Sequence, residues 1–367
     1  MRFFTLCLMS SALLLGCQKP PQPTNTDKQT LQQTNKTTTT QQNCTNLNQA
    51  MQNIDERSSI EALNQVNAQL KQCISQVKNT QQLQWLQNSS NMYLRFMQGH
   101  QSKKGYDQFL NLEEYLYRLM DQDSSWQSIQ QIKNFQAKPE LFKKLSPRDQ
   151  YLLQHQGQAY IELQDQGEGI IDYRRQPQYI LDVFAPSLPI DQKIFVQRMA
   201  KDNQDLFYID AAINASWAEL IERALFWEKY LQQYPQSYFA KDAQRLLDEY
   251  SFLIFFGSDN TPAPVPYTGL ASDQETDKEA LQQIQHLAKQ KHSHLAEVAQ
   301  KYLAFTTTPL EQRQQKFALT TANTVTDNPE SNSSEQLHEL LPLKSPFEST
   351  DYRDCHQDAI CIQYNIN

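Results

Sequence analysis

The chain of 367 residues contains little glycine, only 8 residues in all. Glycine supplies the positive φ angles that tight β-turns need, so its scarcity argues against an all-β protein built from many hairpins. Basic residues are also in deficit, with 33 Lys and Arg against 41 Asp and Glu and a formal net charge of −8. Because the chain has no basic field to attract phosphate backbones, the composition excludes nucleic acid as an expected partner.

The sequence also lacks the short motifs that mark common catalytic and cofactor sites. HExxH, GxSxG, the P-loop and GxGxxG do not occur. His286, His292 and His294 lie close together, with Glu297 one turn beyond His294, but a turn expected near residues 291–293 would separate them. We therefore predict no catalytic residues, no metal and no cofactor, and the sequence favours a protein that is not an enzyme.

The most distinctive segment is apolar and stands at the start of the chain. Arg2 supplies a positive charge, and the uncharged residues 3–15 that follow are too few for a bilayer span, which needs roughly 20. The run ends in Leu14-Leu15-Gly16-Cys17, which resembles the lipobox of bacterial lipoproteins. The alternative is an ordinary cleaved signal followed by an incidental cysteine.

The lipobox resemblance implies a location. Residues 1–16 would be a signal peptide, and Cys17 would be acylated with palmitate-type chains and tied to the lipid bilayer. Gln18 in place of aspartate would direct the lipoprotein to the outer membrane of a Gram-negative cell, with its body in the periplasm rather than on the cell surface. Residues 17–43 are rich in Gln, Thr, Asn and Pro, and they predict a flexible tether.

The remaining cysteines suit an oxidising compartment. Cys44, Cys73, Cys355 and Cys361 are an even set, from which three pairings can be drawn. We prefer Cys44–Cys73, because the apolar spacing of residues 45–55 and of the segment after Ser59 predicts a helical hairpin that brings these cysteines to its open end. Cys355–Cys361 then closes a small loop at the C-terminus. Zinc binding is the alternative, since His356 lies between the last two cysteines.

The body of the chain has helical spacing. It predicts an all-α fold made of an N-terminal helical region (44–145), a helical-repeat-like region (146–319), and a linker with the disulfide loop (320–367). Ser146-Pro147 is a helix-start signal, and a long helix is expected over about 205–233. Two segments rich in proline or β-branched residues, 167–194 and 257–272, interrupt the pattern as insertions.

Two stretches of the repeat-like region are alike. Residues 237–247 (SYFAKDAQRLL) and 293–303 (SHLAEVAQKYL) share Ser, Ala, Ala, Gln and Leu at equal offsets. We interpret each serine as a helix N-cap and the alanines as points of close helix contact, which is typical of stacked helical hairpins. The residues of these two stretches that we expect at the helix contacts are Ser237, Ala240, Ala243, Ser293, Ala296 and Ala299.

The segment WEKYLQQYPQSYFAKDAQRLL (227–247) resembles a tetratricopeptide-type repeat, as found in the outer-membrane assembly lipoprotein BamD and in Tol–Pal-associated periplasmic repeat proteins. Trp227, Tyr230, Tyr234 and Pro235 carry this match together with the Ser–Ala pattern. A regular period of about 34 residues is absent. The expected architecture is therefore an irregular, TPR-like stack of helical hairpins.

These observations predict an outer-membrane lipoprotein that acts as a helical scaffold or adaptor for another envelope protein. One alternative is a cell-wall-associated enzyme or glycan binder that uses the 167–194 insertion, where Arg174 and Arg175 could grip an anionic ligand. A salt-bridged pair of loop residues is the simpler interpretation of these arginines. A third alternative is an inhibitor of a secreted hydrolase such as lysozyme, with an exposed disulfide loop as its plug.

Overall fold

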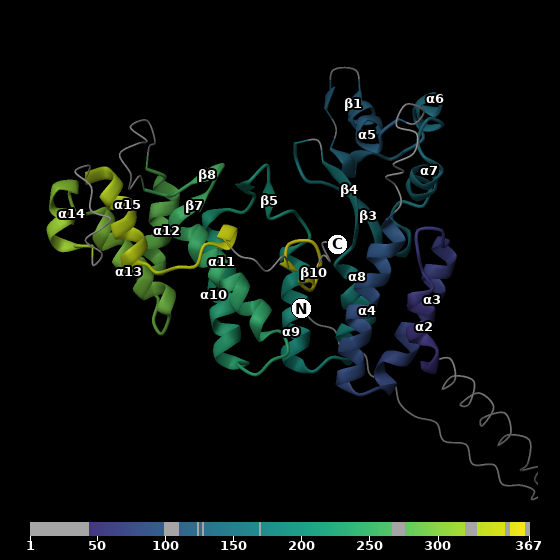
Figure 1. Ribbon diagram of the computed structural model, residues 1–367, viewed down its shortest axis with the longest axis horizontal. Coiled ribbons are helices and arrows are strands. Elements are labelled where there is room, and N and C mark those ends of the chain that lie inside the picture. Colours follow the sequence, from purple (N-terminus) through teal and green to yellow (C-terminus); the bar gives the residue numbers. More distant parts are fainter. Residues whose placement is uncertain are drawn as a thin grey trace, which may run out of the picture. The chain divides into compact units, whose positions relative to one another are not determined.

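Figure 1 shows the computed structural model, which describes residues 44–98, 110–122, 125–126, 128–168, 170–265, 276–319, 329–348 and 353–363. Contacts divide the chain into two units, Met1–Thr45 and Asn46–Asn367, and nearly all described residues belong to the second. Within these ranges the fold is mostly helical, with fourteen α-helices and a few short strands, as predicted. None of these helices is long and apolar enough to cross a membrane. The predicted signal peptide, Cys17 and the tether lie outside the described residues.

The first helices follow from capping and apolar spacing. α2 (Leu47–Gln52), α3 (Ile60–Cys73) and α4 (Asn79–Met97) succeed one another. Ser59 caps α3 by accepting a hydrogen bond from the Ala62 N–H at 3.1 Å. Apolar residues at helical spacing form the buried face of α3, namely Ile60, Leu63, Val66 and Leu70. Cys44 and Cys73 are both disulfide-bonded.

The next segment contains shorter elements. α5 (Leu112–Met120) leads into the two-residue strands β1 (Asp121–Gln122) and β2 (Ser125–Trp126), and α6 (Pro139–Phe142) precedes α7 (Pro147–Gln154). The predicted start of α7 is confirmed, because the Ser146 hydroxyl accepts a hydrogen bond from the Asp149 N–H at 3.0 Å and proline occupies the first helical position.

The 167–194 insertion is part of the packed body. β3 (Ile161–Asp165) and β4 (Ile171–Arg175) form an antiparallel hairpin, in which Ile161 is opposite Arg175. α8 (Gln178–Val183) and α9 (Ile190–Asp202) follow, and α8 packs against α3 and α9. Alternate residues of β4 are buried, so this strand forms a wall of the core.

The helix expected over 205–233 is shorter than predicted. α10 spans Trp217–Gln233, whereas residues before it form the strands β5 (Tyr208–Ile209) and β6 (Ala212–Ile213). Asp210 and Ala211 adopt positive φ angles of 52° and 54°, which end any helix and make the turn between these strands. The prediction was wrong here because local apolar spacing does not report such a turn.

α10 packs along α11 (Ala240–Phe256), and the two helices lie side by side in Figure 1. The short strands β7 (Gly257–Ser258) and β8 (Thr261–Pro262) follow α11 within the predicted 257–272 insertion. α12 (Lys278–Leu287) and α13 (His294–Thr306) form a second pair, and α14 (Leu310–Lys316) and α15 (Pro329–Leu340) form a third. Part of the predicted linker is therefore helical, and Leu337 of α15 is fully buried.

The described chain ends in the strands β9 (Arg353–Asp354) and β10 (Ile362–Gln363), which pair antiparallel. Cys355 and Cys361 between them form the predicted disulfide. We call residues 353–363 the disulfide loop. In Figure 1 it is the yellow ring that carries β10.

Candidate functional site

The disulfide loop is buried in the helical body. Cys355 and Cys361 are almost completely enclosed, as are Ala359 and Ile360 between them. Asn203, the residue that follows α9, donates hydrogen bonds from Nδ2 to the carbonyl oxygens of Cys355 at 2.8 Å and Asp358 at 2.6 Å. A side chain in the middle of the sequence thus holds the backbone of the C-terminal loop.

A buried ion pair joins the disulfide loop to β4. Arg175 Nη2 lies 2.6 Å and Nε lies 2.9 Å from Asp358 Oδ2, and the two side chains are 2% and 1% exposed. Arg175 also donates to the hydroxyl groups of Ser89 and Ser90 on α4, at 3.3 and 2.9 Å. Burial raises the pKa of Asp358, and the charge of Arg175 opposes that rise. Such a pair is costly to break, because either partner alone would be an uncompensated charge in the interior.

A second pair joins the loop to α11. His356 Nε2 lies 2.9 Å from Glu249 Oε1, and Tyr208 donates a hydrogen bond to the same oxygen at 2.8 Å. The imidazole stacks on Phe207 with ring centroids 4.7 Å apart. Burial opposes the charged imidazole, but the charge of Glu249 and its hydrogen bond outweigh burial, so the pKa of His356 is raised. The pKa of Glu249 is lowered, because its contacts with His356 outweigh its own burial.

Three pockets share the disulfide loop as a wall. The α11 pocket, of about 770 Å³, lies between α11 and residues of the segments 343–348 and 353–356. The hairpin pocket, of about 360 Å³, lies between the β3–β4 and β5–β6 turns and is bordered by Asp354, His356 and Gln357. The α4–β4 pocket, of about 220 Å³, lies beside the buried ion pair. A ligand in any of the three would contact the loop.

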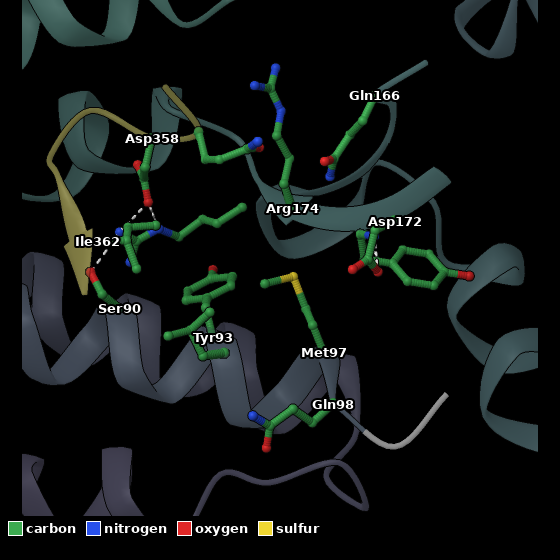
Figure 2. A pocket seen from close by; sticks show the side chains of 13 residues that line it. Ser90, Tyr93, Met97, Gln98, Gln166, Asp172, Arg174, Asp358 and Ile362 are labelled. Atoms are coloured by element: carbon green, nitrogen blue, oxygen red, sulfur yellow. Dashed lines mark hydrogen bonds and ion pairs between the residues drawn. The ribbon is translucent and has the colours of Figure 1, made fainter. Parts of the chain in front are cut away.

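Figure 2 shows the α4–β4 pocket. Tyr93 and Met97 extend into it from α4, and Asp358 faces them from the disulfide loop. Asp358 is bonded to Arg175, whose guanidinium also donates to Ser90. Gln166 and Asp172 border the opposite side from the β3–β4 hairpin. Tyr93 is buried and its pKa is raised well above the usual value by that burial, so its hydroxyl stays protonated as a donor to the Ala159 carbonyl.

Arg174 and Arg175, which we considered as binding residues for an anionic ligand, both form ion pairs within the protein. Arg174 Nε lies 2.7 Å from Glu162 Oε1, and its other nitrogens donate to the carbonyl oxygens of Asn203 and Gln204. Arg175 is in the ion pair with Asp358. The simpler interpretation, a salt-bridged pair of residues, describes them correctly.

The residues of the repeat-like stretches divide into core and surface. Trp227, Tyr230, Ala243, Ala296 and Ala299 are buried, whereas Ala240 and Tyr234 are partly exposed and Pro235 is exposed. Ser293 caps α13 by accepting a hydrogen bond from the Ala296 N–H at 3.2 Å, as predicted.

Ser237 has a different role from the one predicted. α11 begins at Ala240 after Phe239, so Ser237 is not its N-cap. The Ser237 hydroxyl instead donates to Asp191 Oδ2 at 2.6 Å and lies 2.7 Å from the Tyr230 hydroxyl. The serine therefore ties the α10–α11 turn to the start of α9.

The histidines of the repeat-like region lie on separate elements. His286 is in α12, His292 is in the turn that follows, and His294 begins α13. His294 Nδ1 lies 3.5 Å from Glu297 Oε2 at an exposed position. Across the residues that the structure describes, no three His, Cys, Asp or Glu side chains are grouped so that they could hold a metal ion.

Asp358, Glu249 and Asn203 were not among the predicted site residues. The sequence did show that His356 and Asp358 lie between two cysteines six positions apart. Charged residues that become buried in such a loop need partners. Which partners they find depends on contacts across more than 100 residues of sequence.

Comparison with known proteins identifies no family and no relative for the chain. No protein-family model matches the chain, and no curated protein or solved structure is significantly similar to it.

Proposed function

We propose that the protein is a lipid-anchored outer-membrane scaffold whose helical body binds another protein of the cell envelope. The apolar start of the chain, the lipobox-like Leu14-Leu15-Gly16-Cys17 and the polar tether support the anchor. Four cysteines in the disulfide state are consistent with an oxidising compartment such as the periplasm.

The helical pairs support the scaffold. α10–α11, α12–α13 and α14–α15 are consecutive pairs of packed helices, and α10 also contacts α12. We propose that they form an irregular TPR-like stack. Such stacks commonly present extended surfaces to protein partners.

The observation that carries the binding proposal is an apolar rim at the hairpin pocket. Ile170 on the β3–β4 turn is 49% exposed, and Ile209 on the β5–β6 turn is 38% exposed. The turns touch, because a Cβ placed on Gly167 would lie 3.1 Å from Ile209 Cγ2. Ile170 lines the pocket, and Ile209 lies between Tyr208 and Asp210, which also line it. Large apolar side chains exposed beside a pocket are a feature of interaction sites.

The second turn is held in place by its neighbours. Ser258 of β7 donates to the Ala211 carbonyl at 2.8 Å, and the Thr261 hydroxyl of β8 accepts from the Ile213 N–H at 2.8 Å. A partner that binds this rim would therefore meet a surface that needs little reorganisation, which lowers the entropic cost of association.

The inhibitor alternative receives no support from this geometry. An inhibitory plug would have to protrude, whereas both cysteines of the disulfide loop are buried and the loop is bonded to α9, β4 and α11.

The proposal is tested by isolating the tagged full-length protein from cross-linked envelopes. The double variant Ile170→Asp, Ile209→Asp should lose the co-isolated partner, because it places two charges in the apolar contact. The matched control is Ile190→Asp, which changes an isoleucine that is 64% exposed at the start of α9. Equal recovery of the partner with both variants would contradict binding at this rim.

A further inference from the structure

The α4–β4 pocket has walls from three parts of the chain that are distant in sequence. α4, β4 with the adjoining hairpin turn, and the disulfide loop each contribute side chains. Its volume of about 220 Å³ equals roughly seven water molecules at about 30 Å³ each. Sites for drug-sized ligands begin at roughly 300 Å³, so this pocket suits a single small ring.

Three of the four charged side chains that line the pocket are in ion pairs within the protein. Arg175 and Asp358 form the buried ion pair, and Asp358 Oδ1 also accepts from the Ala359 N–H at 2.6 Å. Arg174 is bonded to Glu162, and Figure 2 shows its side chain extending away from α4. Asp172 accepts a hydrogen bond from the Tyr173 N–H at 2.7 Å. An anionic ligand would have to replace Asp358 at Arg175 or Glu162 at Arg174, so the pocket favours an uncharged ligand over an anion.

Three carboxamides border the pocket. Gln98 lies at the end of α4, Gln166 on the β3–β4 hairpin and Gln357 on the disulfide loop. None of the three side chains hydrogen-bonds to another residue in the part of the chain that the structure describes, whereas many other glutamines of the protein do. Each carboxamide offers two N–H donors and one carbonyl acceptor, and this mixture matches hydroxyl groups, which both donate and accept.

Part of the wall is apolar. Leu94 and Met97 of α4 and Ile362 of β10 line the pocket between the carboxamides. A pyranose ring combines hydroxyl groups at its edge with an apolar face of C–H groups. It can therefore bond to the carboxamides at its edge while its face displaces water from the three apolar side chains.

We propose that the α4–β4 pocket binds one uncharged sugar ring of a glycan. This inference goes beyond the scaffold function and does not depend on it, since the pocket and the apolar rim involve different residues apart from Gln166 and Gln357, which border both pockets. A peptide backbone is the competing ligand because it too offers donors and acceptors. The apolar side chains of Leu94, Met97 and Ile362 favour the C–H face of a sugar ring over a peptide backbone.

The test is saturation-transfer NMR and calorimetric titration of the full-length protein with soluble N-acetylglucosamine oligomers. We expect saturation of ring protons and measurable binding. Gln98→Leu, Gln166→Leu together should weaken it by about 5- to 150-fold, since two hydrogen bonds of about 0.5–1.5 kcal/mol each are lost and Gln98 borders only this pocket of the three. The matched control is Gln84→Leu on the exposed side of α4, which should bind as the unaltered protein does.

Three results would overturn the proposal. They are the absence of saturation with the N-acetylglucosamine oligomers, equal affinity of the double variant and the control, and tighter binding of an uncharged tripeptide than of the sugar. Equal urea midpoints for all variants would establish that each is folded. Because the partner test uses Ile170 and Ile209, either proposal can fail while the other stands.

Discussion

Removal of the Asp358 carboxylate should destabilise the fold more than the loss of any exposed ion pair. Asp358→Ala leaves the Arg175 guanidinium, buried between α4 and the disulfide loop, without its anion. Loss of one partner of a buried pair costs about 3–5 kcal/mol. The hydroxyl groups of Ser89 and Ser90 and the rings of Tyr93 and Tyr179 still contact the guanidinium, so we expect a value near 3 kcal/mol.

The assay is equilibrium urea unfolding followed by circular dichroism. With a urea dependence of about 2–3 kcal/mol per M, a loss of 3 kcal/mol lowers the midpoint by about 1–1.5 M. The double variant Arg175→Met, Asp358→Leu buries no charge, and its midpoint should lie above that of Asp358→Ala. Arg57→Met, at the exposed pair with Asp55, is the control and should not change the midpoint.

Two outcomes would refute this reasoning. One is an Asp358→Ala midpoint equal to that of the control, which would mean that the ion pair does not hold the loop. The other is a double variant whose midpoint is no higher than that of Asp358→Ala, because removal of both charges should cost less than removal of one.

Two further predictions concern pH and backbone strain. The raised pKa of His356 stabilises the fold fully below the usual histidine pKa of 6.5, and this stabilisation is lost as the pH rises through the raised pKa. The lowered pKa of Glu249 stabilises the fold above the usual glutamate pKa of 4.5, and this stabilisation is lost as the pH falls through the lowered pKa. The difference in thermal midpoint between the unaltered protein and His356→Gln should therefore shrink above pH 6.5, and a constant difference would contradict the pair. Gly257→Ala should destabilise the protein more than Gly157→Ala in urea unfolding, because a Cβ on Gly257 would lie 2.7 Å from the Ala263 nitrogen and closer still to the Thr261 carbonyl oxygen, whereas nothing lies within 4 Å of a Cβ on Gly157. Gly157, with ψ −4°, is in the left-handed helical region, where another residue costs about 1–2 kcal/mol. Gly257, with ψ −160°, is in a region that essentially only glycine adopts, so backbone strain adds to the contact there, and equal losses would contradict the prediction.

The sequence predicted best the features that depend on neighbours along the chain. The Ser146-Pro147 start of α7 and the Ser293 cap of α13 were correct, because an N-cap involves residues only two or three positions apart. The Cys355–Cys361 disulfide was correct because the two cysteines are only six positions apart in the sequence.

Features that depend on contacts between residues far apart in the sequence were predicted poorly. Ser237 has the same local pattern as Ser293, but Asp191, 46 residues earlier, accepts its hydrogen bond. The turn at Asp210 and Ala211 is bonded by side chains that lie about 50 residues later. The periodicity of apolar residues predicts neither contact.

The candidate site depends on contacts of the same kind. Arg175 and Asp358 are 183 residues apart, so the sequence could identify Arg175 as noteworthy but not its partner. The interpretation of Arg174 and Arg175 as a ligand grip assumed free guanidinium groups, whereas burial next to acidic residues made internal pairing the more stable arrangement.

The lipid anchor is the claim on which location and partner both depend. Intact-mass analysis of the mature protein from Gram-negative membranes tests it directly, with Cys17→Ser as the control. We predict a chain that begins at Cys17 and carries the added mass of acyl chains, while the control loses this mass and leaves the membrane fraction. A mature chain that carries no acyl mass and is recovered in the soluble fraction would contradict the account.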